Sequence, residues 1–402
     1  MDPHEFITAR ANGLEISGIR RIFEASATLK NPINLSIGQP DFAVPEALKQ
    51  AAKDAIDADK NGYTMTRGDA GLLAKVDQLV CEDLGWASPL AVDSPTGIMV
   101  TSGTSGALLL MQLALLEPGD EIIIPDPFFV AYPGQAIVAG GTAVRCDTYP
   151  DFRMTADKVE PLITDRTKAV LLCTPSNPCG VVLTESECAD LLELCRSRDI
   201  ALVSDEIYDV FVYPDAPAPS KAPAGELVAS RLRRAPSAGR LPGAQERVLV
   251  IRGFGKTYGC TGWRMGFVAG PAWLVDAMAK LQQYSFVCAP SIAQHACAAA
   301  FDTDSTDLIK RFIRRRDMVV DRLSQVTEVA RPVGAFYAFP KVPQRMGMTG
   351  TELADKLMAE REVVVIPGSV FSDRDTHFRL SFAVNDDTLE RGLDAICQTL
   401  TQ

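Results

Sequence analysis

Short apolar runs rich in β-branched residues recur through the first two thirds of the chain, and helical patterns separate them. Such alternation is typical of a parallel sheet covered by helices. The pattern therefore predicts an α/β fold with a mostly parallel seven-stranded sheet. The expected strands lie at residues 97–101, 120–125, 142–147, 168–174, 200–205, 247–253 and 265–270.

The pattern changes towards the C-terminus. A helical stretch begins near Pro271, and further helices precede the short apolar runs "AFYAFP", "EVVVIPG" and "FRLSFA". This order is typical of a smaller α+β unit. The N-terminal segment, a predicted helix "ISGIRRIFEASATLK" followed by a short extended stretch, is expected to join that unit. We predict a large domain over residues 45–285 and a small domain from residues 1–44 plus 286–402.

One segment has no periodicity. Between Tyr213 and Arg247 lie six prolines and eight alanines. This composition favours a long, solvated surface insertion. Its five arginines, counting Arg247, leave contact with a ligand as the alternative interpretation.

Composition narrows the classes of function. The chain has 402 residues and a net charge of −11, so no basic field attracts a nucleic-acid backbone. Nucleic acid is therefore not an expected partner, although one local arginine could still hold a small anion. The ten cysteines form no CxxC pair and only three histidines occur (His4, His295 and His377), so no metal site is expected.

The same counts bear on location. Scattered cysteines are interpreted as reduced thiols in a cytoplasmic protein. The N-terminal "MDPHEFITAR" lacks the apolar core of a signal peptide. The longest apolar stretch, "ALLLMQLALL", is about half the roughly 20 residues of a membrane span, so no membrane partner is expected.

The first two groups of candidate residues follow apolar runs. Ser102 to Gly106 form a glycine turn before an apolar helix, where free N–H groups favour a phosphate. An ordinary cap by Ser102 or Thr104 is the alternative. Phe128 and Phe129 follow another run and could stack on a planar ligand or belong to the core.

Further polar residues follow the later runs. Asn177 lies between two prolines, which is also common turn chemistry. Asp205 ends a fully apolar run, so its carboxylate needs a partner, and Tyr208 can point to the same side. Lys256 lies in a glycine-rich turn before Arg264, and a desolvated lysine can act as a nucleophile, although most lysines lie on the surface.

Together these groups indicate one cofactor. All lie just past predicted strand ends, where open α/β sheets bind ligands. Pyridoxal phosphate (PLP) needs a lysine for its aldehyde, a carboxylate for its pyridinium nitrogen and donors for its 3-oxygen. It also needs a flat neighbour for its ring and a cradle for its phosphate.

In order along the chain, these motifs resemble the class I and II aminotransferases among the fold-type I PLP enzymes. The resemblance covers nearly the whole sequence, through "NLSIGQPDF", "GYTMTRG", "TSGTSGAL", "PFFVAYPG", "PSNPCG", "SDEIYDVFVY", "GFGKTYGCTGWRMGF" and "FRLSFA". It implies a transaminase that moves an amino group from an L-amino acid to a 2-oxo acid by a ping-pong mechanism. It also implies a homodimer with shared active sites, and PLP bound by the large domain.

The resemblance also implies catalytic roles. Lys256 resembles the Schiff-base lysine, which also shuttles a proton between the substrate Cα and C4′ of the cofactor. Asp205 resembles the partner of the pyridinium nitrogen. Tyr208 and Asn177 resemble the donors to the 3-oxygen, which lower the pKa of the imine.

Further cofactor contacts follow from the same resemblance. Phe129 resembles the aromatic residue that stacks on the ring. Gly103, Thr104 and Ser105 resemble the phosphate cup, and Arg264 resembles the phosphate-binding arginine.

Substrate and subunit contacts complete the implied site. Arg379 resembles the arginine that pairs with the substrate α-carboxylate, with Asn177 beside it. Gly38 lies in the segment that closes over that carboxylate. Tyr63 resembles the tyrosine that reaches the phosphate of the neighbouring subunit.

Two other functions compete with transamination. The same residues can support a β- or γ-lyase or a cyclising synthase, and the sequence does not separate these from an aminotransferase. The aminotransferase-like half of a transcription regulator would need a DNA-binding domain before "NLSIGQPDF", where only about 30 residues precede it.

The sequence also departs from common family patterns. Many members have a serine where this chain has Gly255, and some also have one where it has Gly253. Some dicarboxylate-specific relatives have a lysine where this chain has Ser105, so its absence disfavours aspartate. The aromatic wall of Phe128, Phe129 and Tyr132 favours neutral or aromatic substrates.

Overall fold

The computed structural model describes residues 6–26 and 29–402, and its centre is a seven-stranded sheet. All seven predicted strands are confirmed, in the spatial order β2-β8-β7-β6-β5-β3-β4. Only β8 runs antiparallel to its neighbours β2 and β7. The bounds are β2 Thr96–Ser102, β3 Glu121–Asp126, β4 Thr142–Asp147, β5 Thr167–Cys173, β6 Ala201–Asp205, β7 Val248–Gly253 and β8 Met265–Pro271.

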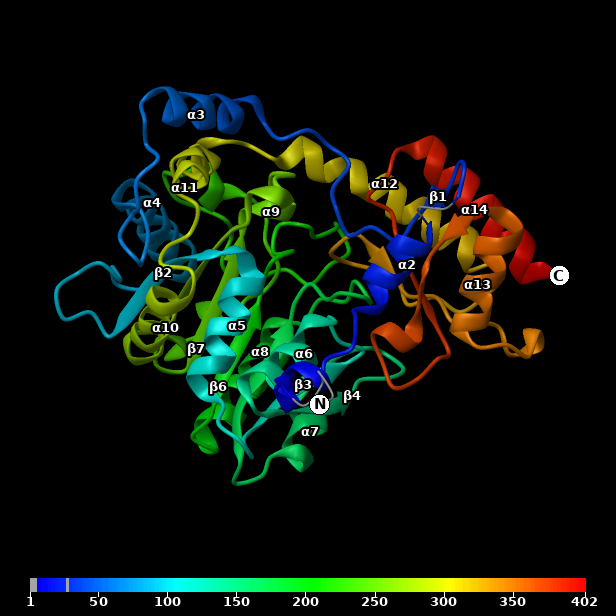
Figure 1. Cartoon of the computed structure of the whole chain (residues 1–402), viewed down its shortest axis with the longest axis horizontal. Coiled ribbons are helices and arrows are strands. Elements are labelled where there is room, and N and C mark those ends of the chain that lie inside the picture. The colour runs from blue at the N-terminus through cyan, green and yellow to red at the C-terminus, as the bar shows by residue number, and fades with distance from the viewer. Residues whose placement is uncertain (1–5, 27–28) are drawn as a thin grey trace.

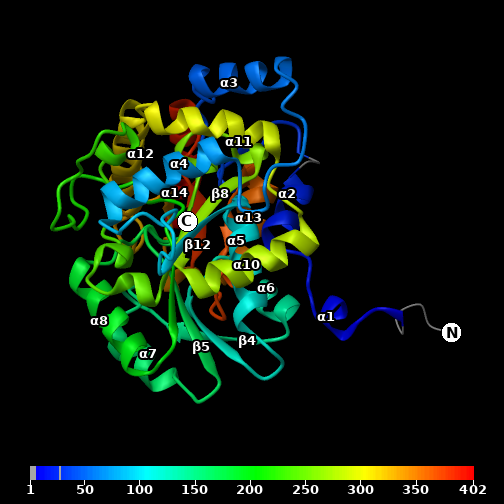
Figure 2. The ribbon, with the colours of Figure 1, turned by 90° about the vertical axis from the view of Figure 1, so that its left-hand side faces the viewer.

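Helices cover both faces of this sheet, because its strands are apolar on both sides. One face packs against α5, α6 and α10, and the other against α4 and α8 (Figure 2). Successive residues of a strand enter opposite cores, so Leu202 packs with α8 while Val203 packs on the α5 face. The helices of this part are α3 Glu46–Asp57, α4 Ala70–Leu79, α5 Gly103–Leu115, α6 Ala131–Ala139, α7 Ala156–Val159, α8 Glu185–Ser197, α9 Phe254–Thr257, α10 Ala272–Ser285 and α11 Ser291–Ala298.

A second core lies at the C-terminal end of the chain (Figure 1). Three strands form an antiparallel sheet in the order β11-β12-β9, and the N-terminal β1 pairs in parallel with β10. Helices α12 to α14 pack on these strands. The bounds are β1 Ile33–Asn34, β9 Tyr337–Ala338, β10 Val363–Val364, β11 Ile366–Pro367, β12 Phe378–Ser381, α12 Thr306–Leu323, α13 Gly350–Arg361 and α14 Asp386–Thr401.

The N-terminal segment passes between the two parts of the molecule (Figure 1). It contains α1 (Ala9–Asn12) and α2 (Gly18–Ser26), so the predicted helix is confirmed up to Ser26. His4, Ala27 and Thr28 lie outside the described residues, and Leu29 and Lys30 are not helical, so the predicted helix does not extend to Lys30. The division into residues 45–285 and residues 1–44 plus 286–402 stays a prediction.

Local sequence signals set several helix starts. α8 and α13 both begin with a capping box, in which a threonine and a glutamate three residues later satisfy each other's backbone N–H groups. The pairs are Thr184 with Glu187 and Thr349 with Glu352. By contrast, no side chain caps α5 at Ser102, although this residue was one expected cap. The first N–H groups of α5 therefore stay available.

The Pro- and Ala-rich insertion differs from the prediction. Its first half is largely exposed around residues 217–226, as expected. Its second half is buried, and Leu227, Ala229, Ala238 and Ala244 belong to the core beneath the sheet. The prediction of a solvated surface segment was therefore wrong for this half, because residues without periodicity pack as short 3₁₀ turns.

The ten cysteines all lie in the described residues. They are free, and seven of them are buried. Across residues 6–26 and 29–402, no helix combines the length and the apolar character that crossing a bilayer requires.

Candidate active site

A cavity lies where the C-terminal ends of β2, β5, β6 and β7 meet the second core. Its volume of about 220 Å³ is more than ten times the roughly 10–15 Å³ that one water needs, so it can hold a small organic molecule. Most of the predicted site residues line it. They are Gly38, Gly103, Thr104, Ser105, Phe129, Asn177, Asp205, Tyr208, Lys256, Arg264 and Arg379.

The antiparallel direction of β8 helps to assemble this site. Arg264 precedes β8, whereas Thr104, Asn177 and Lys256 follow β2, β5 and β7. Because β8 runs antiparallel, its beginning lies at the same edge as the ends of β2 and β7. Arg264 therefore reaches the cavity from the beginning of a strand, at the edge of the sheet where β2 and β7 end.

Lys256 lies on the four-residue helix α9, directly after β7. Its side chain is half-buried and lines the cavity, and its Nζ donates a hydrogen bond to the Gly38 carbonyl oxygen. Burial, followed by repulsion from Arg379 and Arg264, lowers the pKa of Lys256 to about 8. The amine is therefore available as a neutral nucleophile far more often than an exposed lysine is.

Asp205 ends β6 with its carboxylate buried. Its Oδ2 accepts a hydrogen bond of 2.8 Å from the Tyr132 hydroxyl. Burial raises the pKa of Asp205 to about 6, although Tyr132 and the Ile207 N–H group favour its charged form. The sequence suggested Tyr132 only as part of a substrate wall, and the structure gives it this second contact.

Tyr208 and Tyr337 form a pair of buried hydroxyls 2.8 Å apart. Tyr208 follows Asp205 by one turn, and Tyr337 comes from β9 of the second core. Burial, with the Tyr337 contact, raises the pKa of Tyr208 well above its usual range. Tyr208 therefore stays protonated and able to donate.

Arg379 is the most unusual group in the cavity because its guanidinium is only 2% exposed yet bonds to neutral oxygens. Nη1 donates to Asn177 Oδ1 at 3.0 Å and Nη2 donates to the Ser36 carbonyl at 2.7 Å. The Nε atom of Arg379 is buried without a hydrogen-bond partner, and burial lowers the pKa of the guanidinium group. The Tyr337 ring lies 4.5 Å from the guanidinium carbon. A buried cation with an unused donor fits a carboxylate ligand.

The start of α5 and Arg264 form a second anion-binding place. Gly103 adopts a left-handed φ of +71°, and a Cβ there would lie 2.6 Å from Arg264 Nη2. Only glycine therefore lets the guanidinium approach the helix start. The uncapped N–H groups and the guanidinium together suit a phosphate.

The glycine at position 255 has a local reason. A Cβ at Gly255 would lie 3.3 Å from the Thr261 Cα, which is a tight contact with backbone. A serine there would require Thr261 to shift. Thr261 also lines the cavity, so its side chain occupies space beside the lysine helix.

More cationic than anionic side chains line the cavity. Lys256, Arg264 and Arg379 supply three cationic groups, and Asp205 is the carboxylate among the residues lining the described cavity. This local excess of positive charge opposes the overall charge of −11. It favours a ligand that carries both a phosphate and a carboxylate.

Tyr63 is the predicted site residue that lies elsewhere. Its side chain is 86% exposed, and it does not line the cavity. Tyr337 was missed, because nothing in "AFYAFP" distinguishes a cavity residue from a core residue. Ile19 of α2 also lines the cavity and was missed for the same reason.

Comparisons with known proteins agree with this geometry. The family of aminotransferases of class I and II matches residues 30–396. The aspartate aminotransferase of Pyrococcus abyssi is 33% identical over 96% of both chains. The aromatic-amino-acid aminotransferase 2 of Thermococcus litoralis is 32% identical over 96% of both. The crystal structure of the aspartate aminotransferase of Thermotoga maritima superposes with a TM-score of 0.88 at 30% identity, covering 98% of this chain and 100% of that one.

A fold-type I scaffold with this cavity defines a class of transaminases. The chain belongs to the family of class I and II aminotransferases. It is an enzyme that transfers an amino group from an amino acid to a 2-oxo acid. The lyase or synthase alternative has no support among these relatives, which are named as aminotransferases.

Proposed function

We propose that this aminotransferase uses PLP, held by the residues that line the cavity. The observation that carries the proposal is one cavity that holds the Lys256 amine with its lowered pKa, the uncapped start of α5 beside Arg264, and Arg379, whose Nε lacks a hydrogen-bond partner. Gly103 and Arg264 would hold the phosphate, and Phe129 would lie against the ring. When bound, PLP supplies an aldehyde for covalent attachment of an amine and a ring that accepts an electron pair.

The residues around the ring have distinct tasks in this proposal. The Asp205 carboxylate, oriented by Tyr132, keeps a proton on the ring nitrogen. The Tyr208 hydroxyl and the Asn177 amide nitrogen donate to the 3-oxygen, since the Asn177 amide oxygen already accepts from Arg379. Lys256 Nζ takes a proton from the substrate Cα and returns one to the product. Arg379 fixes the substrate carboxylate, so that Cα lies near this amine.

Label transfer tests the proposed function directly. Protein loaded with PLP is mixed with individual ¹⁵N-labelled amino acids, and the visible absorbance is followed before an unlabelled 2-oxo acid is added. We expect absorbance loss with the first substrate and the label in the new amino acid, as a ping-pong mechanism requires. Label released as ammonia, with none in a new amino acid, would instead indicate elimination. The same screen identifies the preferred side chain.

The pH dependence of cofactor loading follows from the lowered pKa of Lys256. Only the neutral amine attacks an aldehyde, and its fraction rises as pH approaches the pKa from below. With a pKa of about 8, the neutral fraction rises from about 1% at pH 6 to about half at pH 8, so we expect loading to accelerate by about 50-fold between these pH values and then level off. Stopped-flow absorbance of the apoprotein with PLP measures this rate. A rise that continues to pH 10 would show an ordinary lysine instead.

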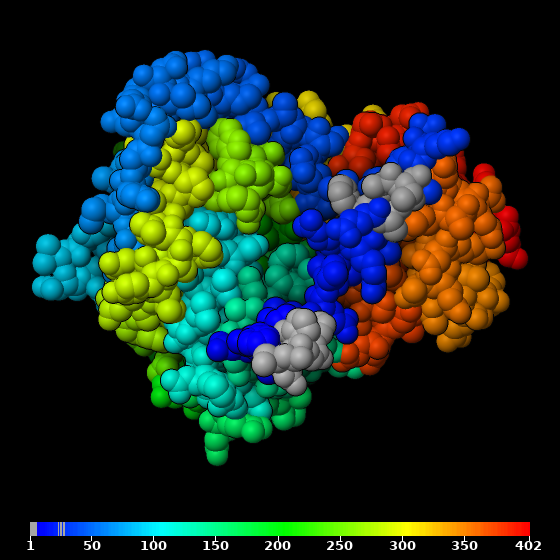
Figure 3. All heavy atoms as spheres, viewed as in Figure 1, coloured from blue at the N-terminus to red at the C-terminus, as the bar shows by residue number. Residues whose placement is uncertain are grey.

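We also propose a homodimer, supported by exposed apolar side chains on two adjoining surface segments. Tyr63, Met65 and Tyr284 are each at least 79% exposed. The Thr66 carbonyl accepts a hydrogen bond from Gln282, so these segments adjoin. Figure 3 shows the segment around residue 280 next to α5 at the surface. Such patches mark interfaces between proteins.

In the dimer, Tyr63 would reach the phosphate of the other subunit. Sedimentation at assay concentration that gave only the 43.4 kDa monomer would contradict this arrangement. The free cysteines support a reducing, cytoplasmic location, which fractionation would test.

A further inference from the structure

The turn after β6 presents its acidic residues to two different places. Asp205 and Tyr208 line the cavity, whereas Glu206 and Asp209 point into a buried group of charges on the other side. This group, here named the buried ion network, consists of Asp83, Glu206, Asp209, Arg234, Arg240 and Arg252. None of its members lines the cavity.

Arg252 is the centre of the buried ion network. Its Nη1 donates to Asp83 Oδ2 at 2.7 Å and its Nε donates to Glu206 Oε2 at 3.0 Å. Its Nε also lies 3.4 Å from Asp209 Oδ2. Arg252 lies on β7, four residues before Lys256 of α9, so its bonds to Glu206 and Asp209 connect the strand that leads to the lysine with the segment that carries Asp205 and Tyr208.

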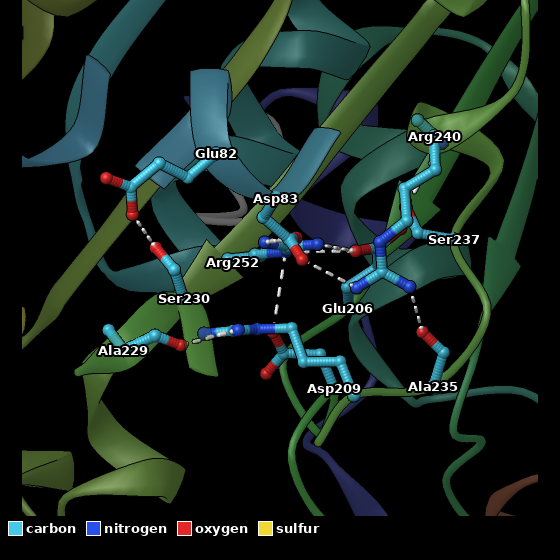
Figure 4. Close-up of polar contacts among 12 residues, drawn as sticks. Glu82, Asp83, Glu206, Asp209, Ala229, Ser230, Ala235, Ser237, Arg240 and Arg252 are labelled. Carbon is cyan, nitrogen blue, oxygen red and sulfur yellow. Dashed lines mark hydrogen bonds and ion pairs between the residues drawn. The ribbon is translucent and has the colours of Figure 1, made fainter. Parts of the chain in front are cut away.

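The insertion supplies the other two cations. Arg234 Nε donates to Asp209 Oδ2 at 2.7 Å, and its Nη1 donates to the Ala229 carbonyl at 2.6 Å. Arg240 Nη2 donates to Asp83 Oδ1 at 2.8 Å. Figure 4 shows Asp83 between Arg240 and Arg252.

Two more contacts fasten the insertion to the same turn. The Ser237 hydroxyl donates to Glu206 Oε1 at 2.6 Å, and the Ala235 N–H group donates to the Asp209 carbonyl at 2.8 Å. At its other end, Glu82 accepts from the N–H groups of Glu226 and Leu227 and from the Ser230 hydroxyl. The insertion thus holds both the backbone and the side chains of the turn.

The network is balanced, with three carboxylates facing three guanidinium groups. Burial alone would raise the pKa of Asp83, but Arg252, Arg234 and Arg240 outweigh burial and lower it. Asp83 therefore stays charged at neutral pH, and each of its two carboxylate oxygens accepts a hydrogen bond from an arginine. Charged groups buried with such directional bonds fix a geometry more than they add stability.

We propose that the insertion, through Arg234 and the buried ion network, positions the turn that carries Asp205 and Tyr208 for the cofactor. Arg234 is thus a positioning residue and touches neither cofactor nor substrate. The inference rests on the proposed function, because it concerns the same cofactor. In this inference, the Pro- and Ala-rich insertion acts on the active site indirectly, by holding the turn after β6.

The test compares three variants of the full-length protein. Arg234→Met removes the tie to Asp209. Arg234→Met combined with Asp209→Asn also lacks the tie but leaves no unpaired charge, so it remains informative if the single variant does not fold. Arg233→Met is the matched control, since Arg233 is exposed and bonds only to carbonyl oxygens of the insertion.

Cofactor affinity and the pH midpoint of the visible absorbance are measured well below the thermal midpoint of each folded variant. Loss of a residue that orients a ligand-binding group typically costs 10- to 100-fold at metal sites, and we expect about a tenfold weaker PLP affinity here. We expect the pH midpoint to rise by about 0.5 to 1 unit, because a displaced Tyr208 donates less well to the 3-oxygen. Both changes should occur in the double variant and neither in Arg233→Met.

The opposite outcomes are distinct. If the double variant melts earlier but keeps wild-type PLP affinity and pH midpoint, the network is structural only and the inference is wrong. If the wild-type protein does not change the visible absorbance of PLP, the proposed function itself is wrong. Measured affinities therefore separate the two failures.

Discussion

Replacing Lys256 with alanine is expected to lower transaminase turnover by at least about 10⁴-fold, because general acid–base catalysis alone commonly contributes 10²- to 10⁴-fold. The amine of Lys256 lies in the cavity, and its lowered pKa of about 8 leaves a substantial fraction of it neutral near physiological pH. Without this amine, the cofactor has no lysine to which it can attach covalently. Proton transfer at the substrate Cα also loses its nearby base. Single-turnover absorbance with a preferred amino acid measures the loss.

A matched control distinguishes this effect from a general loss of charge. Lys310 lies on the exposed side of α12, so Lys310→Ala should retain wild-type turnover. Circular dichroism should show that both variants fold. Full turnover by Lys256→Ala would refute the central assignment.

The second large effect is expected at Arg379. Replacing it with leucine removes two charge-assisted hydrogen bonds to a substrate carboxylate, each worth about 1.5–3 kcal/mol. We expect kcat/KM for amino acids to fall by about 10³-fold, which corresponds to about 4 kcal/mol. Steady-state kinetics with the preferred amino acid measure the change.

A comparison of substrates gives this prediction its specificity. An amine that lacks the α-carboxylate should react equally slowly with the wild type and with Arg379→Leu, because neither can use the missing contact. Arg379→Lys should fall between them, since one ammonium cannot replace the planar pair of donors that reaches Asn177 and Ser36. Equal losses for both substrates would indicate a damaged cavity instead of a lost carboxylate contact.

The sheet could be predicted because its strands are apolar on both faces. Each run of residues such as 168–174 had no polar alternation, and burial between two helical layers explains this. The direction of β8 was not predictable by the same means. An apolar run reads alike in either direction, so only the hydrogen-bonded neighbours β2 and β7 define it as antiparallel.

Part of the site was beyond a reading of local motifs. Residues at or just after strand ends, such as Asp205 and Lys256, can be predicted from their position relative to the apolar runs. Tyr132 and Tyr337 do not, because their contacts with Asp205 and Tyr208 span 73 and 129 residues of sequence. Such pairs depend on the packing of helices and of the second core, which periodicity does not specify.

The insertion was misread for a related reason. Its arginines looked like a solvated charge run, since sequence alone does not reveal opposite charges supplied from afar. Asp83 precedes Arg240 by 157 residues and yet is its partner. Burial of charge is thus the least predictable feature of this chain.

The alternation of side chains along β6 has a consequence for how the chain can vary. Asp205 and Glu206 are adjacent acids with opposite destinations, one toward the cavity and one toward Arg252. A slip of one residue between β5 and β7 would exchange them and would also turn Leu202 and Val203 into the wrong cores. Single-residue insertions and deletions in this strand should therefore be far less tolerated than substitutions, because the pleat decides which of two neighbouring carboxylates faces the cavity.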